Sequence, residues 1–215
     1  MKRHLFSILA VAAFALPATA FAQFKMPSFG GTPAAGANSN SSGDLQGRQS
    51  HLVQAYAAAD KTVLLANADM LAAVGMQGDA AKLRATADSL NGGSTQGNLA
   101  DSDKALSEST VKLSEQLKDT KPLDDASKKT FASGMLKLAL SAVQYADVVR
   151  IAQDVASGIS SANPLQMMKL KAAIYIVASV PKSAKMASDS LSNVTKFATA
   201  HDIAKPSESD ISKAL

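Results

Sequence analysis

Apolar residues recur at alternating steps of four and three along much of the chain after residue 47. An α-helix turns once in ~3.6 residues, so this spacing places them on one stripe of a helix. The stripe is clearest in residues 48–74 and 125–157, where we predict two long helices. Gly75 and Gly78 end the first, and Asp124 or Asp125 is placed to cap the second. Apolar residues also flank the second stripe, so we expect that helix to be central and contacted from two sides. The stripes consist of Leu52, Tyr56, Ala59, Val63, Ala66, Met70 and Ala73, and of Phe131, Met135, Leu138, Ala142, Tyr145, Val149 and Ala152.

Capping and breaking residues predict where the other helices begin and end. Asp79 is placed to cap a short helix that ends near Leu90, and a helix with a narrow leucine seam follows over residues 99–118. Asn163-Pro164 starts the next helix, with Asn as N-cap and Pro at the first helical position. We expect Pro181 to kink or break that helix, because proline lacks the N–H that an interior position donates.

These elements predict an all-α protein, an elongated antiparallel helical bundle of four to five main helices over residues 48–203. A C-terminal tail, residues 204–215, follows, with a short helix that Ser207 and Asp210 open in the manner of a capping box. The composition agrees, because aromatic residues, which strands favour, make up only 5% of the chain. The chain has no cysteine. Its fold therefore depends on the core alone, and thiol chemistry is excluded.

The first residues have the layout of a cleavable export signal. Lys2 and Arg3 precede an apolar run, Leu5 to Leu16, which is too short to span a bilayer. A proline and the small residues of Ala20-Phe21-Ala22 follow, in the order that a signal peptidase reads. We predict a signal peptide over residues 1–22, cleavage after Ala22, and a periplasmic or secreted bacterial protein. The rival interpretation is a buried N-terminal helix.

Residues 23–47 are rich in Gly, Ser, Asn, Pro and Ala. Such a segment buries too little apolar surface to offset the entropy lost on ordering, so we predict a disordered linker. Phe24, Met26 and Phe29 lie at its start, where they belong either to a loose N-terminus or to a motif that docks on a partner or on the bundle.

The charges give no support to nucleic-acid binding. The whole chain has a formal net charge of +4, but removing Lys2 and Arg3 with the signal leaves 20 basic against 18 acidic side chains. The basic excess lies in residues 121–215, with 12 basic and 8 acidic side chains. Such asymmetry is more often a property of solvated helix faces than of a binding face.

No pattern in the sequence indicates catalysis, a cofactor or a metal. His51 and His201 lie outside any metal-ligand spacing. Asp101-Ser102-Asp103 lacks the glycine and the downstream acid of a calcium loop, and we interpret its acids as paired only in sequence. Ser179 and Lys182 form a Ser-x-x-Lys with a proline inside it and no supporting motif. We therefore predict no catalytic, cofactor-binding or metal-binding residue.

The stretch between Asp154 and Asp189 contains no acid, yet four lysines flank an apolar run over residues 172–180. A buried core helix with lysines at its exposed ends explains this, and we favour that interpretation. The alternative is a membrane or ligand surface, in which lysines meet anionic head groups. Its residues are Met167, Met168, Lys169, Lys171, Tyr175, Lys182 and Lys185.

We therefore predict a non-enzymatic binding or structural role in the bacterial cell envelope, with another envelope protein or an anionic membrane surface as partner. One alternative is a carrier of an apolar or lipid ligand, held between the 125–157 helix and the segment around Met167–Val180. Another is a peripheral membrane-surface protein that binds through residues 165–185. A hydrolase is the last alternative, and convergent Ser, Lys or Asp side chains in a cleft would favour it.

Overall fold

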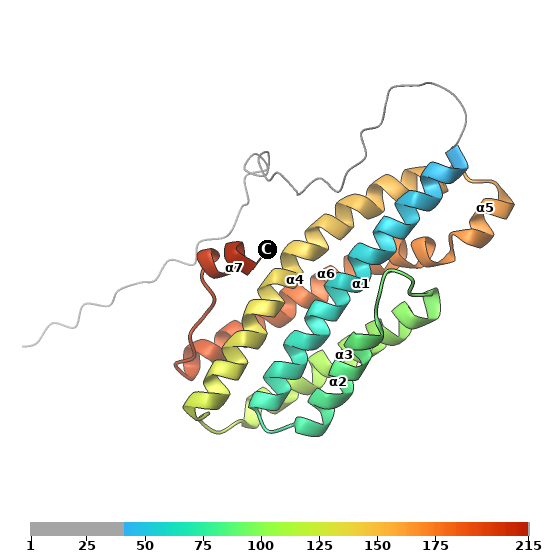
Figure 1. Ribbon diagram of the computed structural model, residues 1–215. Coiled ribbons are helices and arrows are strands. Elements are labelled where there is room, and N and C mark those ends of the chain that lie inside the picture. Colours follow the sequence, from blue (N-terminus) through green and yellow to red (C-terminus); the bar gives the residue numbers. More distant parts are fainter. Residues whose placement is uncertain (1–40, 215) are drawn as a thin grey trace, which may run out of the picture. The chain divides into compact units, whose positions relative to one another are not determined.

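The structure is a computed structural model that describes the backbone of residues 41–214 and the side chains of residues 45–214. The predicted signal peptide, its cleavage site and the linker residues before 41 lie outside the described residues. The described part is all-α, as predicted, and contains no strand (Figure 1). Its helices are α1 (Ser41–Ala73), α2 (Gln77–Ser89), α3 (Gln96–Asp119), α4 (Asp125–Ile159), α5 (Pro164–Lys169), α6 (Lys171–Ala200) and α7 (Glu208–Ala214).

Helices α1, α3, α4 and α6 lie side by side in the bundle, with α2 against α1 and α3 (Figure 1). The start of α1 meets the end of α4, and the end of α1 meets the first half of α4, so these two helices are antiparallel. Helix α3 runs parallel to α1, because α2 carries the chain back before α3 begins. Residues 56, 60 and 67 of α1 accordingly meet residues 103, 102 and 109 of α3.

The central helix is α1, not the 125–157 helix that the sequence suggested. Helix α1 packs against α2, α3, α4 and α6, whereas α4 packs against α1 and α6 and is touched by α7. The two-sided contact predicted for α4 is present. Of the apolar residues that flank its stripe, Val148 and Val155 are buried, whereas the others are partly covered or, like Val143, exposed. The polar residues Asp60 and Asn67 of α1 are also fully buried. The apolar stripe alone does not predict the burial of these polar residues.

Close approach of α1 and α4 depends on a glycine. A Cβ placed on Gly134 would lie 2.6 Å from Cγ of Met70 and 2.8 Å from the carbonyl oxygen of Ala66. The backbones of the two helices are therefore nearer than any side chain at position 134 would allow. Aromatic packing joins α4 to α6, where the rings of Phe131 and Phe197 lie 5.1 Å apart.

Several predicted helix ends are confirmed. Asp124 caps α4 by accepting from the Ser127 N–H at 2.7 Å, and this bond lowers the pKa of the Asp124 carboxyl. Asn163 caps α5, which has proline at its first position. Ser207 and Asp210 form the predicted capping box of α7.

Three predicted boundaries are wrong. Helix α1 begins at Ser41 instead of Arg48, so residues 41–47, assigned to the linker, are helical; burial of Leu45 against Gly158 extends the core to them. Asp79 makes no cap for α2 and pairs instead with Lys112 at 2.8 Å. No helix break occurs at Pro181, and the chain leaves the helical conformation at Leu170 instead.

Helix α6 runs through Pro181 without interruption from Lys171 to Ala200. Pro181 is exposed, so water can reach a carbonyl that has lost its helical donor. Leu170, by contrast, is buried between α5 and α6, and its non-helical backbone lets the chain turn there. Within residues 41–214, each helix is too short or too polar to cross a membrane.

Candidate functional site

The three tyrosines of the chain meet inside the bundle, although they lie on three different helices. Their hydroxyls bind two aspartates, and two serines complete the arrangement. We call this set the tyrosine–aspartate network, and it consists of Tyr56 and Asp60 of α1, Ser102 and Asp103 of α3, Tyr145 of α4, and Tyr175 and Ser183 of α6. It therefore links four helices through side chains that are far apart in sequence.

Asp60 forms the inner half of the network and is fully buried. Its carboxyl accepts from the Tyr145 hydroxyl at 2.5 Å and from the Ser102 hydroxyl at 3.0 Å. Burial, followed by the negative charge of nearby Asp103, raises the pKa of Asp60 to about 8. Asp60 is thus protonated near neutral pH, which removes the cost of a second buried charge beside Asp103.

Asp103 forms the outer half and is partly exposed. Its two carboxyl oxygens accept from the hydroxyls of Tyr56 at 2.7 Å and Tyr175 at 2.5 Å, and Ser183 lies 3.4 Å away. Burial, followed by the hydrogen bond to Asp103, raises the pKa of Tyr175 to about 12, so its hydroxyl remains a donor at neutral pH. Asp103 is therefore fixed in position by donors from α1 and α6.

A groove of about 460 Å³ opens above Asp103, between α3 and α6. Its walls carry cations, Lys104 and Lys182, and its acids are Asp103 and Glu108. The remaining lining residues are small, hydroxylic or apolar: Ala100, Ser107, Tyr175, Ser179, Ser183 and Met186. The groove thus offers both signs of charge and several hydroxyls over a floor that the tyrosine–aspartate network holds rigid.

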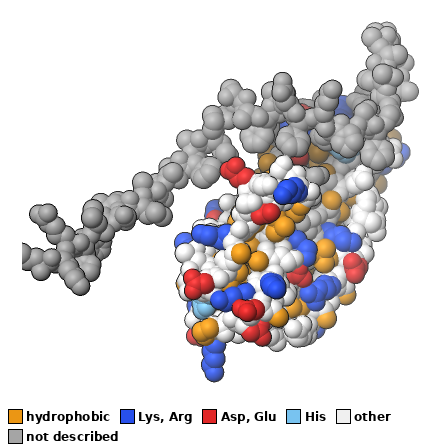
Figure 2. All heavy atoms as spheres, turned by 60° about the vertical axis from the view of Figure 1, so that its left-hand side comes forward, with side chains coloured by type: hydrophobic (Ala, Val, Ile, Leu, Met, Phe, Trp, Pro, Cys, Tyr) orange, Lys and Arg blue, Asp and Glu red, His pale blue; other side chains and the backbone are white. Residues whose placement is uncertain are grey.

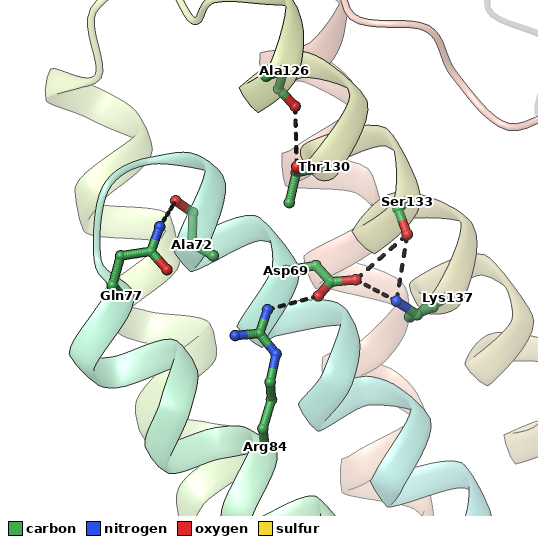
Figure 3. A network of polar contacts seen from close by, with 8 residues as sticks. All are labelled: Asp69, Ala72, Gln77, Arg84, Ala126, Thr130, Ser133 and Lys137. Carbon is green, nitrogen blue, oxygen red and sulfur yellow. Dashed lines mark hydrogen bonds and ion pairs between the residues drawn. The ribbon is translucent and has the colours of Figure 1, made fainter.

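A second polar cluster joins α1, α2 and α4 and does not line the groove. Asp69 of α1 pairs with Arg84 of α2 at 3.0 Å and with Lys137 of α4, and Ser133 contacts the same carboxyl (Figure 3). Asp69 is largely buried, whereas its cations are partly exposed. All of its charges are engaged with one another, so we assign this cluster a structural role.

The seven residues predicted for a membrane or ligand surface fall in different places. Tyr175 and Lys182 line the groove. Lys185 is exposed on α6 and pairs with Asp189 at 2.5 Å. The remaining four, Met167, Met168, Lys169 and Lys171, are exposed on or directly after α5. Ile176, in the apolar run between these groups, is completely buried, as the core interpretation requires.

Sequence reasoning missed the network because its partners are 42 to 127 residues apart. The acids of Asp101-Ser102-Asp103, interpreted as paired only in sequence, have different surroundings, since Asp101 is exposed and Asp103 binds two tyrosines. A signal did exist. Asp60 follows Tyr56 by one helical turn inside an apolar stripe, where an acid needs a buried partner.

His51 and His201, the histidines that the structure describes, are not grouped with acids as metal ligands. His51 is exposed, and His201 stacks on Phe197 with ring centroids 4.0 Å apart. Among the residues that the structure describes, no three His, Cys, Asp or Glu side chains are grouped to hold a metal ion. On the face drawn in Figure 2, basic and acidic side chains are intermixed, so that face has no continuous basic surface of the kind that binds nucleic acid.

Comparisons with models of known protein families, with curated proteins and with solved structures find no match to this chain.

Proposed function

We propose that the chain is an exported helical-bundle protein of the bacterial cell envelope that binds a small zwitterion, such as an amino acid or a short peptide, without altering it. The export part of this proposal rests on residues 1–22, with their basic start, apolar run and Ala20-Phe21-Ala22. The binding part rests on the groove between α3 and α6.

The observation that carries the proposal is the pairing of charges in this groove. A zwitterion presents a carboxylate, which Lys182 would bind, and an ammonium, which Asp103 would bind, whereas Lys104 and Glu108 pair with each other at 4.0 Å. The volume of about 460 Å³ is in the usual range for small-molecule sites. Asp103 needs no rearrangement to bind a ligand, because Tyr56 and Tyr175 already fix its carboxyl. Such preorganisation reduces the entropic cost of binding.

The alternative of an apolar-ligand carrier has less support. It required an apolar cavity between α4 and the segment around Met167–Val180, whereas the groove lies between α3 and α6 and four charged residues line it. A polar groove of this kind disfavours an acyl chain, since charged groups would lose water without gaining a partner.

The hydrolase alternative gains one observation, because Ser179, Lys182, Ser183 and Asp103 converge on the groove. Ser183, however, is almost fully buried and its hydroxyl contacts Tyr56 at 3.0 Å. A nucleophile must reach its substrate, and this side chain is held inside the bundle. Ser179 is the remaining candidate nucleophile, so the test of binding includes an assay for turnover.

Isothermal titration calorimetry tests the proposal with the individual L-amino acids and alanine dipeptides as probes. We expect at least one probe to bind, and we expect N-acetylation or C-amidation of that probe to weaken binding about tenfold or more, because each removes one charged partner. Lys182→Met should have a similar effect. Lys185→Met is the matched control, since Lys185 lies on the same helix but pairs with Asp189 outside the groove lining.

Three results would contradict the proposal. The first is the absence of binding by every probe, and the second is equal binding by the Lys182→Met and Lys185→Met proteins. The third is hydrolysis of p-nitrophenyl acetate that Ser179→Ala abolishes, which would assign the groove to catalysis.

A further inference from the structure

Helix α5 lies at the end of the bundle where α1 begins and α4 ends (Figure 1). A capping box defines its first turn: the Asn163 side chain accepts from the Gln166 N–H and the Gln166 side chain accepts from the Asn163 N–H, both at 2.9 Å. Leu170, directly after the helix, is buried and joins α5 to the core. None of the six residues of α5 is itself buried, so the helix projects from the bundle.

Three large apolar side chains of α5 point into solvent. Leu165 is 75% exposed, Met168 68% and Met167 37%. Among the described residues, only Val111 and Val143 are other large hydrophobic side chains of comparable exposure, and they lie on different helices. Leu165 and Met168 are three residues apart, so they share one side of α5. Exposed apolar residues that gather in this way mark a binding surface more often than single ones do.

The surroundings of this patch specify the charge of its partner. Lys169 and Lys171 are exposed directly beside it, and residues 155–188 contain no acid. Beside it is a hollow of about 170 Å³ with a mixed lining: the leucines Leu45, Leu165 and Leu170, the amides Gln46, Asn163 and Gln166, and Lys169. Apolar side chains with adjacent lysines match the two layers of an anionic bilayer surface, the acyl boundary and the phosphate groups.

We propose that α5 is a membrane-contact element that docks the bundle on anionic phospholipid through Leu165, Met167 and Met168, with Lys169 and Lys171 on the head-group phosphates. This surface differs from the membrane surface considered in the sequence, because Ile176 belongs to the core and Tyr175 and Lys182 belong to the groove. The proposal is independent of what the groove binds.

Vesicle co-sedimentation tests the proposal with a chain that begins at Gln23, which contains the whole bundle and lacks the apolar run of residues 5–16. We expect binding to phosphatidylglycerol vesicles, weaker binding to phosphatidylcholine vesicles, and loss of binding as salt is raised, because salt shortens the Debye length. Lys169→Gln and Lys171→Gln should each weaken binding roughly fivefold. The double variant Leu165→Ser/Met168→Ser should abolish it.

Val111→Ser is the matched control, because it removes a similarly exposed apolar side chain from α3. It should bind vesicles as the unaltered chain does, and all variants should keep the same helical circular dichroism. The proposal is overturned if the unaltered chain stays in the supernatant, or if Leu165→Ser/Met168→Ser still sediments. It is also overturned if the chain is a dimer that this double variant converts to a monomer, since a second copy would then cover α5.

Discussion

The hydroxyl of Tyr145 donates to Asp60 across 2.5 Å in the middle of the bundle, and thereby ties α4 to α1 through two side chains 85 residues apart. The ring of Tyr145 also meets the ring of Tyr56 edge-on, with centroids 6.1 Å apart. Because Tyr56 binds Asp103 in turn, one continuous set of hydrogen bonds and aromatic contacts runs from the core to the floor of the groove. The stability of the bundle and the shape of the groove therefore depend on the same residues.

The raised pKa of Asp60, about 8, predicts that the protein loses stability as pH rises. An unfolded aspartate has a pKa of about 3.9. Between these values the folded chain holds a proton that the unfolded chain has released, so the free energy of unfolding falls with pH. The loss begins near pH 4 and is complete above about pH 8. Urea denaturation across this range measures it.

Asp60→Asn should flatten this dependence and make the protein more stable than the unaltered chain above about pH 8, because the amide is neutral at every pH. The carboxyls of Asp79, Asp124 and Asp210 have lowered pKa values, so their stabilising contribution is lost only in acid, below about pH 4. These three carboxyls therefore do not cause a change in unfolding free energy near neutral pH. If the unfolding free energy of the Asp60→Asn protein fell with pH as steeply as that of the unaltered chain, Asp60 would not be the group that carries the buried proton.

Two glycines in helices should respond in opposite ways to alanine. At Gly134 the new Cβ would approach the Ala66 backbone at 2.8 Å, so Gly134→Ala should separate α1 from α4 and cost roughly 1–3 kcal/mol of unfolding free energy. At Gly47 nothing lies within 4 Å, so Gly47→Ala should stabilise the protein by up to about 1 kcal/mol through better helix propensity. Thermal and urea denaturation of both variants check this. Similar effects would refute the close α1–α4 approach.

The export signal predicts that the protein recovered after secretion begins at Gln23. Intact-mass spectrometry of that protein checks the cleavage after Ala22, which the small residues of Ala20-Phe21-Ala22 specify. A mass that includes Met1 would remove the support for a place in the cell envelope, while leaving the groove and its chemistry unaffected.

The sequence predicted those parts of the fold that depend on local rules. The stripes of α1 and α4, the caps at Asp124 and Asn163, and the end of α1 at Gly75 all follow from residues close together in the chain. The continuity of α6 at Pro181 did not follow, because whether a helix tolerates proline depends on which side of it is exposed.

The site was not predictable in the same way. The apolar stripe around Asp60 indicates that this acid needs a buried partner, but it does not say which one. Asp60 and Asp103 come together through the parallel packing of α3 on α1, which depends on the reversal through α2. Ser179 and Lys182 were identified as a weak motif, but their place in a charged groove required the position of α3. Tyr175 and Lys182 were singled out for a surface role, and the structure puts them in the wall of this groove.

Chemical-shift mapping is the most direct test of whether a zwitterion binds in the groove between α3 and α6. Amide resonances of the isotopically labelled protein are recorded while the tightest-binding amino acid or dipeptide is added. We predict saturable shifts confined largely to residues 100–108 of α3 and 175–186 of α6, with Lys182→Met suppressing them and Lys185→Met leaving them intact. Shifts that centre elsewhere in the bundle, or no saturable shifts at all, would contradict a zwitterion site in the groove.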